Sequence, residues 1–154
     1  IQEFEERMGH VLKKYPYLVA ERDGQLVGYA YAGPFKERAA YDWAGETTVD
    51  VRKDQKKTGI GRKLYKELER ALSMQNILNL NACIAYPRKK DPYLTKDSVF
   101  FHQHMGYRLV GEFYQCGYKF GHWYNMVWME KHLDSHLEKP LPVLTFPEIR
   151  DQLY

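Results

Sequence analysis

The sequence has few cysteines, no long apolar run and no strong charge of one sign. Its 154 residues include only Cys83 and Cys116, whose surroundings lack metal-ligand spacing. No apolar stretch approaches the roughly 20 residues of a membrane helix, and a net charge of +3 is too small to indicate nucleic-acid binding by itself. We therefore expect a cytoplasmic protein without a nucleic-acid, membrane or metal partner, its cysteines being buried thiols.

Familiar catalytic and nucleotide-binding patterns are also missing. There is no G-x-x-x-x-G-K-[ST] segment, which excludes a P-loop, and no third glycine that would complete a G-x-G-x-x-G dinucleotide fingerprint. No Ser/His/Asp arrangement indicates a protein nucleophile. The chain also has no repeats and no low-complexity stretch, so a single globular domain is expected at this length.

Hydrophobic periodicity predicts a mixed α/β domain over residues 1–131. A tail at 132–154 holds three prolines and is expected to pack along the surface of that domain. Asp23-Gly24 is a hairpin signal between two strand patterns. The strand patterns cover residues 17–22, 26–32, 46–51, 77–85, 107–118 and 123–130, and the helical patterns cover 3–14, 60–72 and 97–105.

The most informative unit is a strand that enters a helix through a glycine-rich turn, Thr58-Gly59-Ile60-Gly61. Such a turn exposes backbone N–H groups at the positive end of the helix dipole, an arrangement that binds phosphate. The glycines lack a Cβ, so a pyrophosphate could approach the main chain closely. An isolated G-x-G is more often a plain loop end, but the strand, the helix and the basic neighbours favour a phosphate site. Those neighbours are Lys53, Lys56, Lys57 and Arg62.

This turn resembles the acetyl-CoA motif of the GNAT superfamily of N-acetyltransferases, usually Gln/Arg-x-x-Gly-x-Gly/Ala, with Lys56 in its first position. More narrowly, the chain resembles the phosphinothricin acetyltransferase family. The segments that carry this resemblance are Tyr29–Pro34, Ala40–Trp43, Glu46–Val49 and the stretch from Gly117, with Gly121, Trp123 and Trp128 at the family's spacing.

The resemblance implies a mixed, mostly antiparallel central sheet flanked by helices, with the family's first strand and first helix outside this sequence. It also implies acetyl-CoA as the cofactor, with its pyrophosphate on the glycine turn. The residues implied to bind it are Val49, Val51, Lys56, Lys57, Thr58, Gly59, Ile60, Gly61, Arg62 and Ser98.

Acetyl transfer from a thioester to an amine needs a neutral amine and a proton source for the leaving thiolate. The resemblance assigns Glu46 as the carboxylate that accepts the amine proton; without it, an exposed strand-end glutamate would be the plainer interpretation. His102 matches a family position near the cofactor sulfur, and histidine suits proton transfer at neutral pH. An ordinary packing histidine is an equal alternative.

The family acetylates the amino group of small amino-acid-like molecules, and the resemblance implies direct attack in a ternary complex by a homodimer. Two alternatives remain: an acetyltransferase of protein or peptide amines, and a non-catalytic CoA-binding module. The basic run 88–90, on a polar loop at 87–96 that is long for the family, is expected to be solvated. The acceptor pocket could be lined by Tyr41, Trp43, Tyr118, His122 and Trp123, with core or dimer packing as the alternative.

Overall fold

The computed structural model describes residues 2–153, with side chains described from residue 6 onward. Over this range the strands hydrogen-bond in the order β1-β2-β3-β4-β6-β5, in a mixed α/β fold of the predicted class. The elements are α1 (Gln2–Leu12), β1 (Tyr17–Arg22), β2 (Gln25–Pro34), β3 (Ala44–Val51), α2 (Ile60–Met74), β4 (Asn79–Tyr86), α3 (Asp97–His104), β5 (Arg108–Lys119), β6 (His122–His132) and α4 (Phe146–Ile149). The chain divides into two compact units, residues 1–80 with 132–154 and residues 81–131.

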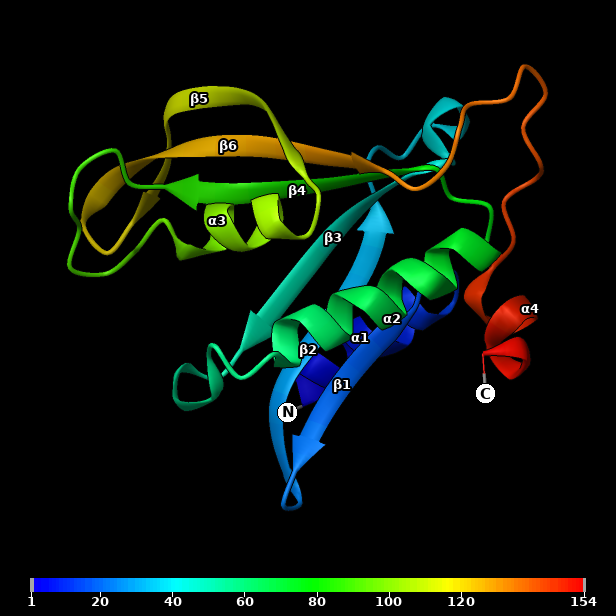
Figure 1. Cartoon of the computed structure of the whole chain (residues 1–154), viewed down its shortest axis with the longest axis horizontal. Coiled ribbons are helices and arrows are strands. Elements are labelled where there is room, and N and C mark those ends of the chain that lie inside the picture. The colour runs from blue at the N-terminus through cyan, green and yellow to red at the C-terminus, as the bar shows by residue number, and fades with distance from the viewer. Residues whose placement is uncertain (1, 154) are drawn as a thin grey trace. The chain divides into compact units, whose positions relative to one another are not determined.

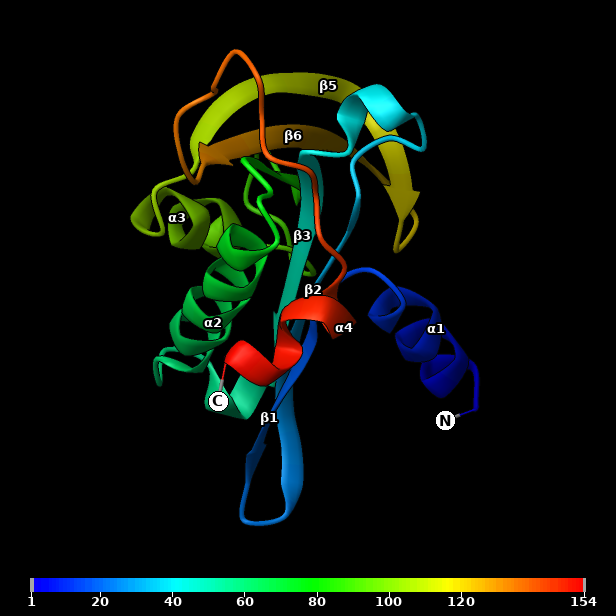
Figure 2. The same ribbon diagram turned by 90° about the vertical axis from the view of Figure 1, so that its right-hand side faces the viewer.

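In the first unit, β2 pairs antiparallel with both β1 and β3. Asp23 and Gly24 have φ of 54° and 77°, as the predicted hairpin turn requires. Helices α1 and α2 lie on opposite faces of these strands (Figures 1 and 2). Gly28 permits the close approach of α2, because a Cβ there would lie 3.0 Å from the Asp50 carbonyl oxygen and 3.3 Å from Leu64 Cδ1.

Part of the C-terminal tail is buried, whereas the sequence predicted that the tail packs along the surface. Phe146, Ile149 and Leu153 are buried and form a core cluster with Ala71 of α2. The side chain of Gln75 is fully buried, and its Nε2 donates to the carbonyls of Lys14 (2.8 Å) and Leu144 (2.9 Å). The sequence suggested surface packing because the segment contains prolines and its apolar residues, Phe146, Ile149 and Leu153, are too few to show a helical pattern.

The second unit is built from most of β4, helix α3 and the β5–β6 hairpin (Figure 1). Gly106 has φ 94° directly after α3, as its predicted C-terminal position requires. Both cysteines lie in strands, as expected, but Cys116 is exposed and Cys83 only half-buried. The expectation of buried thiols is therefore wrong, because Cys116 lies in a strongly exposed stretch of β5.

Candidate active site

The glycine turn forms as predicted and leaves the start of α2 without a side-chain cap among the described residues. Gly59 is the N-cap, in the left-handed region at φ 86°, and Lys57 is also left-handed at φ 63°. The Thr58 hydroxyl donates to the Gln55 carbonyl, three residues earlier, at 2.5 Å and so closes the turn. The first N–H groups of α2 therefore lie at the positive end of the helix dipole, suited to an anion.

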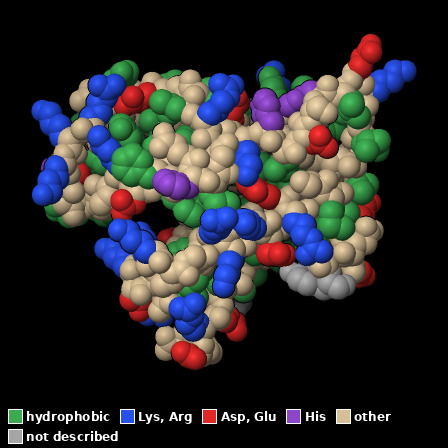
Figure 3. All heavy atoms as spheres, in the orientation of Figure 1, with side chains coloured by type: hydrophobic (Ala, Val, Ile, Leu, Met, Phe, Trp, Pro, Cys, Tyr) green, Lys and Arg blue, Asp and Glu red, His purple; other side chains and the backbone are tan. Residues whose placement is uncertain are grey.

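Side chains from the β1–β2 hairpin hold this turn in place. Arg52 donates to Gln25 Oε1 at 3.0 Å and to Asp54 Oδ2 at 2.6 Å, and Arg22 donates to Gln55 Oε1 at 2.8 Å. The first turn of α2 contains no acidic residue. Lys and Arg side chains gather over this region in Figure 3. The exposed cations predicted around the turn are Lys53, Lys56, Lys57 and Arg62.

Strand β3 presents two chemically different faces. Thr47, Val49 and Val51 alternate toward α2, where the Tyr65 hydroxyl donates to Thr47 Oγ1 at 3.3 Å. Glu46 lies on the opposite face, and its cross-strand partner is Gly33. A Cβ built on Gly33 has no atom within 4 Å among the described residues. The sheet is therefore open beside the Glu46 carboxylate.

Glu46 has the environment of a general base. It is half-buried, and burial raises the pKa of its carboxyl, while the nearby Lys36 opposes this shift. A raised pKa makes the carboxylate a stronger proton acceptor once it is ionised. Glu46 and the glycine turn also lie on one continuous segment, β3 and its C-terminal extension.

His102 is a buried residue of α3 with a defined tautomer. Its Nδ1 lies 2.7 Å from the Ser98 carbonyl, which can only accept, so Nδ1 carries the proton. Burial lowers the pKa of the ring below its ordinary value. The rings of Phe101 and Tyr107 pack edge-on against it at 5.4 and 5.0 Å. His102 is therefore a neutral ring with an acceptor lone pair on Nε2 at physiological pH. Ser98, expected at the cofactor, lies in the first turn of the same helix.

The predicted acceptor residues fall into two groups. Tyr41 is exposed in the first unit, whereas Trp43 donates its indole N–H to the Leu141 carbonyl of the tail at 2.8 Å. In the second unit, Tyr118 and Trp123 are a cross-strand pair with ring centroids 5.0 Å apart, and His122 lies next to them at the hairpin turn. The structure thus brings three of the five together on β5–β6 and gives Trp43 a packing contact with the tail.

Comparison with known proteins places this geometry in a family. An acetyltransferase (GNAT) domain model matches residues 1–128. The chain belongs to the GNAT acetyltransferase family. It is 35% identical to a phosphinothricin N-acetyltransferase of Streptomyces viridochromogenes over 86% of this chain and 69% of that protein.

Two solved structures support the same placement of this GNAT chain. A phosphinothricin acetyltransferase from Sinorhizobium meliloti in complex with acetyl-CoA has a TM-score of 0.78 at 26% identity, covering 94% of this chain and 78% of that one. A ribosomal-protein-alanine N-acetyltransferase from Brucella melitensis has a TM-score of 0.72 at 31% identity, covering 85% and 75%.

The donor set of the turn fits the cofactor of this GNAT enzyme, acetyl-CoA. The uncapped N–H groups of α2 and the surrounding cations match a pyrophosphate, and Gly59 keeps the approach to the main chain open. The residues proposed to hold the cofactor in this chain are those of the turn, together with Val49 and Val51 of β3. Acetyl-CoA, when bound, supplies the thioester carbonyl that donates the acetyl group.

The basic run 88–90 of the GNAT chain is exposed, as expected of a solvated run, but Arg88 also makes specific contacts. Arg88 forms an ion pair with Glu112 at 3.0 Å and lies against the Tyr114 ring, and Lys89 and Lys90 are likewise exposed. The expected exposure therefore holds for all three residues, and Arg88 has in addition partners that lie 24 and 26 residues away in sequence.

No helix among residues 2–153 is long and apolar enough to cross a membrane.

Proposed function

We propose that this enzyme acetylates the amino group of a small amino-acid-like acceptor by direct attack in a ternary complex. The observation that carries the proposal is Glu46, a half-buried carboxylate with a raised pKa that faces open space beside Gly33. The phosphinothricin acetyltransferases among its relatives support an acceptor of this size. In the second unit the proposed acceptor wall consists of Tyr118, His122 and Trp123, and Tyr41 of the first unit is a separate candidate.

Glu46 is proposed to accept the proton of the acceptor ammonium, directly or through one water, so that the neutral amine can attack. With acetyl-CoA bound, the new C–N bond would replace the C–S bond of the thioester, and the proton that the amine nitrogen loses on acylation would go to the leaving CoA thiolate. His102 remains a proposed catalytic residue in a restricted sense. The proton of the neutral ring is on Nδ1, which donates a hydrogen bond to the Ser98 carbonyl. The Nε2 atom therefore carries no proton to donate, but it can accept one.

An acetyl-CoA consumption screen tests the proposed function. The acceptors should include amino acids, their sulfoximine and phosphinic analogues, polyamines and peptides with free N-termini. We expect turnover with one or more of the amino-acid-like compounds. Binding of CoA without acetylation of any amine would overturn the proposal.

A second candidate is acetylation of a protein or peptide N-terminus. It is favoured by the similarity to a protein named as a ribosomal-protein-alanine N-acetyltransferase, at 31% identity. The peptide arm of the same screen separates the two functions, because preference for peptides over every free amino acid would support the second.

Gly33→Leu is expected to raise the acceptor KM by about tenfold and leave the acetyl-CoA KM unchanged. The leucine side chain would project beside Glu46 into space that is now open, on backbone that L-residues adopt without strain. Gly33→Ala should give a smaller rise, and thermal unfolding should show both variants as stable as the wild type. Equal rises in both KM values would contradict an acceptor site at this position.

The enzyme is also proposed to be a homodimer, because the outer strand β5 exposes apolar side chains. Leu109, Val110 and Phe113 are 52%, 56% and 56% exposed. Val110→Glu should therefore convert a dimer into a monomer in sedimentation-velocity measurements, since burial of an unpaired charge is unfavourable. A monomeric wild type would contradict the proposal.

The cytoplasmic location expected from the sequence stays a prediction.

A further inference from the structure

The pairing of β5 with β6 is interrupted by a bulge. Phe113 pairs with Met126, and the next pair joins Gly117 to Tyr124, so that three residues of β5 face the single residue Asn125 of β6. A one-residue slip in a strand moves every following side chain to the other face of the sheet. Whatever holds the bulge therefore decides which face of the hairpin end carries which side chains.

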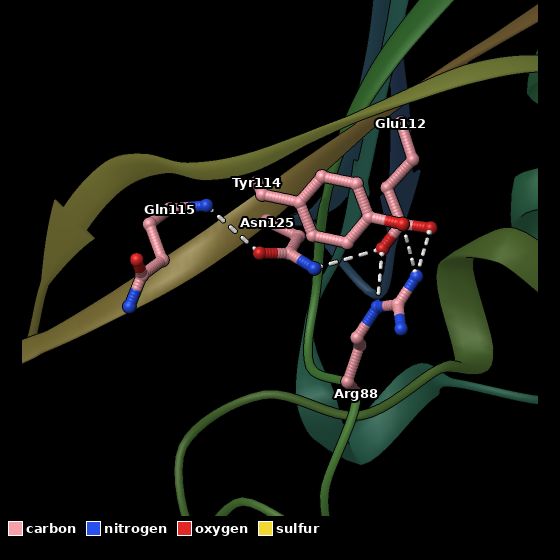
Figure 4. A network of polar contacts seen from close by, with 5 residues as sticks. All are labelled: Arg88, Glu112, Tyr114, Gln115 and Asn125. Carbon is pink, nitrogen blue, oxygen red and sulfur yellow. Dashed lines mark hydrogen bonds and ion pairs between the residues drawn. The ribbon is translucent and has the colours of Figure 1, made fainter.

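The Asn125 side chain bridges the bulge. It is buried, and its Oδ1 accepts the backbone N–H of Gln115 at 2.8 Å, in place of a regular ladder bond. Gln115 lies in the left-handed region at φ 48°. The Asn125 Nδ2 donates to Glu112 Oε2 at 2.8 Å, and only this amide orientation satisfies both partners. Figure 4 shows the resulting chain of contacts from the bulge to Glu112.

Arg88 extends this chain to the long loop at 87–96. Its Nε and Nη2 donate to the two Glu112 carboxylate oxygens at 3.0 and 3.1 Å, a bidentate pair, and Nη2 also donates to the Tyr114 hydroxyl at 2.6 Å (Figure 4). The Arg88 side chain is 55% exposed but that of Glu112 only 18%. The pKa of Glu112 lies below its ordinary value, first because of Arg88 and then because of Asn125. Arg88 is thus the cation that pairs with a partly buried carboxylate of β5.

The same loop contacts the hairpin at two further points. The Tyr124 hydroxyl donates to both carboxylate oxygens of Asp91 at 3.0 Å. The Tyr93 ring stacks on Phe120 of the hairpin turn with centroids 4.9 Å apart, and it lies 5.9 Å from the His122 ring. The loop therefore follows the hairpin from its bulge to its tip.

We propose that Arg88 is a positioning residue for acceptor recognition, which acts through Glu112 and Asn125 to hold the bulge. It thereby fixes the presentation of the hairpin end that carries Tyr118, His122 and Trp123. This inference rests on the proposed function, since it takes these three residues as part of the acceptor wall. The loop at 87–96 then supports the hairpin end and thereby determines acceptor specificity.

Arg88→Gln is expected to raise the acceptor KM about tenfold, to leave the acetyl-CoA KM within twofold, and to broaden the range of acceptors. The neighbouring Lys89→Gln removes the same charge from an exposed side chain and should change neither constant. Arg88→Lys should recover only part of the loss, because an ammonium cannot form the bidentate pair. A variant that had lost only general stability would lower the apparent kcat, through a smaller folded fraction, and leave both KM values unchanged.

Glu112→Gln provides an independent route to the same test. The double variant Arg88→Gln/Glu112→Gln should be no worse than the more affected single variant, since both act through one contact. Amide hydrogen exchange should accelerate at Gln115 and over residues 117–124 in Arg88→Gln but not in Lys89→Gln. An active wild type with an unchanged acceptor KM in Arg88→Gln would overturn the inference and leave the proposed function standing. If the wild type acetylates no amine, the proposed function fails. Unchanged hydrogen exchange in Arg88→Gln would then also contradict the claim that Arg88 holds the bulge.

Discussion

Glu46→Gln is expected to lower kcat/KM by about 10²–10⁴, the usual contribution of a positioned general base. Glutamine has nearly the same size and hydrogen-bonding reach as glutamate but cannot take up a proton. The variant should therefore bind acetyl-CoA with a Kd within twofold of the wild type, because the glycine turn is unchanged. Steady-state kinetics with the best acceptor from the screen, together with calorimetric titration of CoA, would measure both quantities.

The pH dependence gives a second readout of the same residue. A base must be ionised to act, and the pKa of Glu46 is raised from 4.5. The acidic limb of kcat/KM should therefore have its midpoint above 4.5, and this limb should disappear in Glu46→Gln. The matched control is Asp50→Asn, an exposed carboxylate four residues further along the same face of β3. Wild-type activity in Glu46→Gln, or an equal loss in Asp50→Asn, would remove Glu46 from the mechanism.

Much of the first unit could be predicted because its signals are local. The hairpin at Asp23-Gly24, strand β1 and the start of α2 at Ile60 follow from turn chemistry and periodicity over a few residues. Strand β4 begins at Asn79 and not at Ile77, because the N–H of Ile77 still bonds to the Leu72 carbonyl at the end of α2. Such a helix ending depends on one backbone bond that hydrophobicity does not report.

The site was predictable only where one segment carries it. The turn and Glu46 lie on consecutive elements, so the strand–glycine–helix pattern indicated a candidate phosphate site and the resemblance assigned a candidate base. The Arg88–Glu112–Asn125 contacts join a loop to two strands across a bulge, and a bulge changes the pairing register without changing the apolar pattern. Gly33 could not be singled out from the sequence either, because only the strand register places it opposite Glu46.

Gly59→Val is expected to weaken CoA binding by about 10- to 100-fold, or about 1.4–2.7 kcal/mol. Gly59 has φ 86°, where a β-branched residue is strained by about 1–3 kcal/mol. The turn can relieve this strain by leaving the left-handed region, which would rotate the first N–H groups of α2 away from the phosphate position. Calorimetric titration of CoA would measure the affinity, and thermal unfolding would measure the accompanying loss of stability.

The matched control for this variant is Gly24→Val in the β1–β2 hairpin. Gly24 has φ 77°, and neither glycine has a described atom within 4 Å of a built Cβ, so the two substitutions impose similar backbone strain. We expect a comparable loss of stability in both variants, because the strain is local to each turn. Only Gly59→Val should lose CoA affinity, since only Gly59 caps the helix whose N–H groups are proposed to bind the pyrophosphate. If both variants bind CoA as tightly as the wild type does, the pyrophosphate does not lie on this turn.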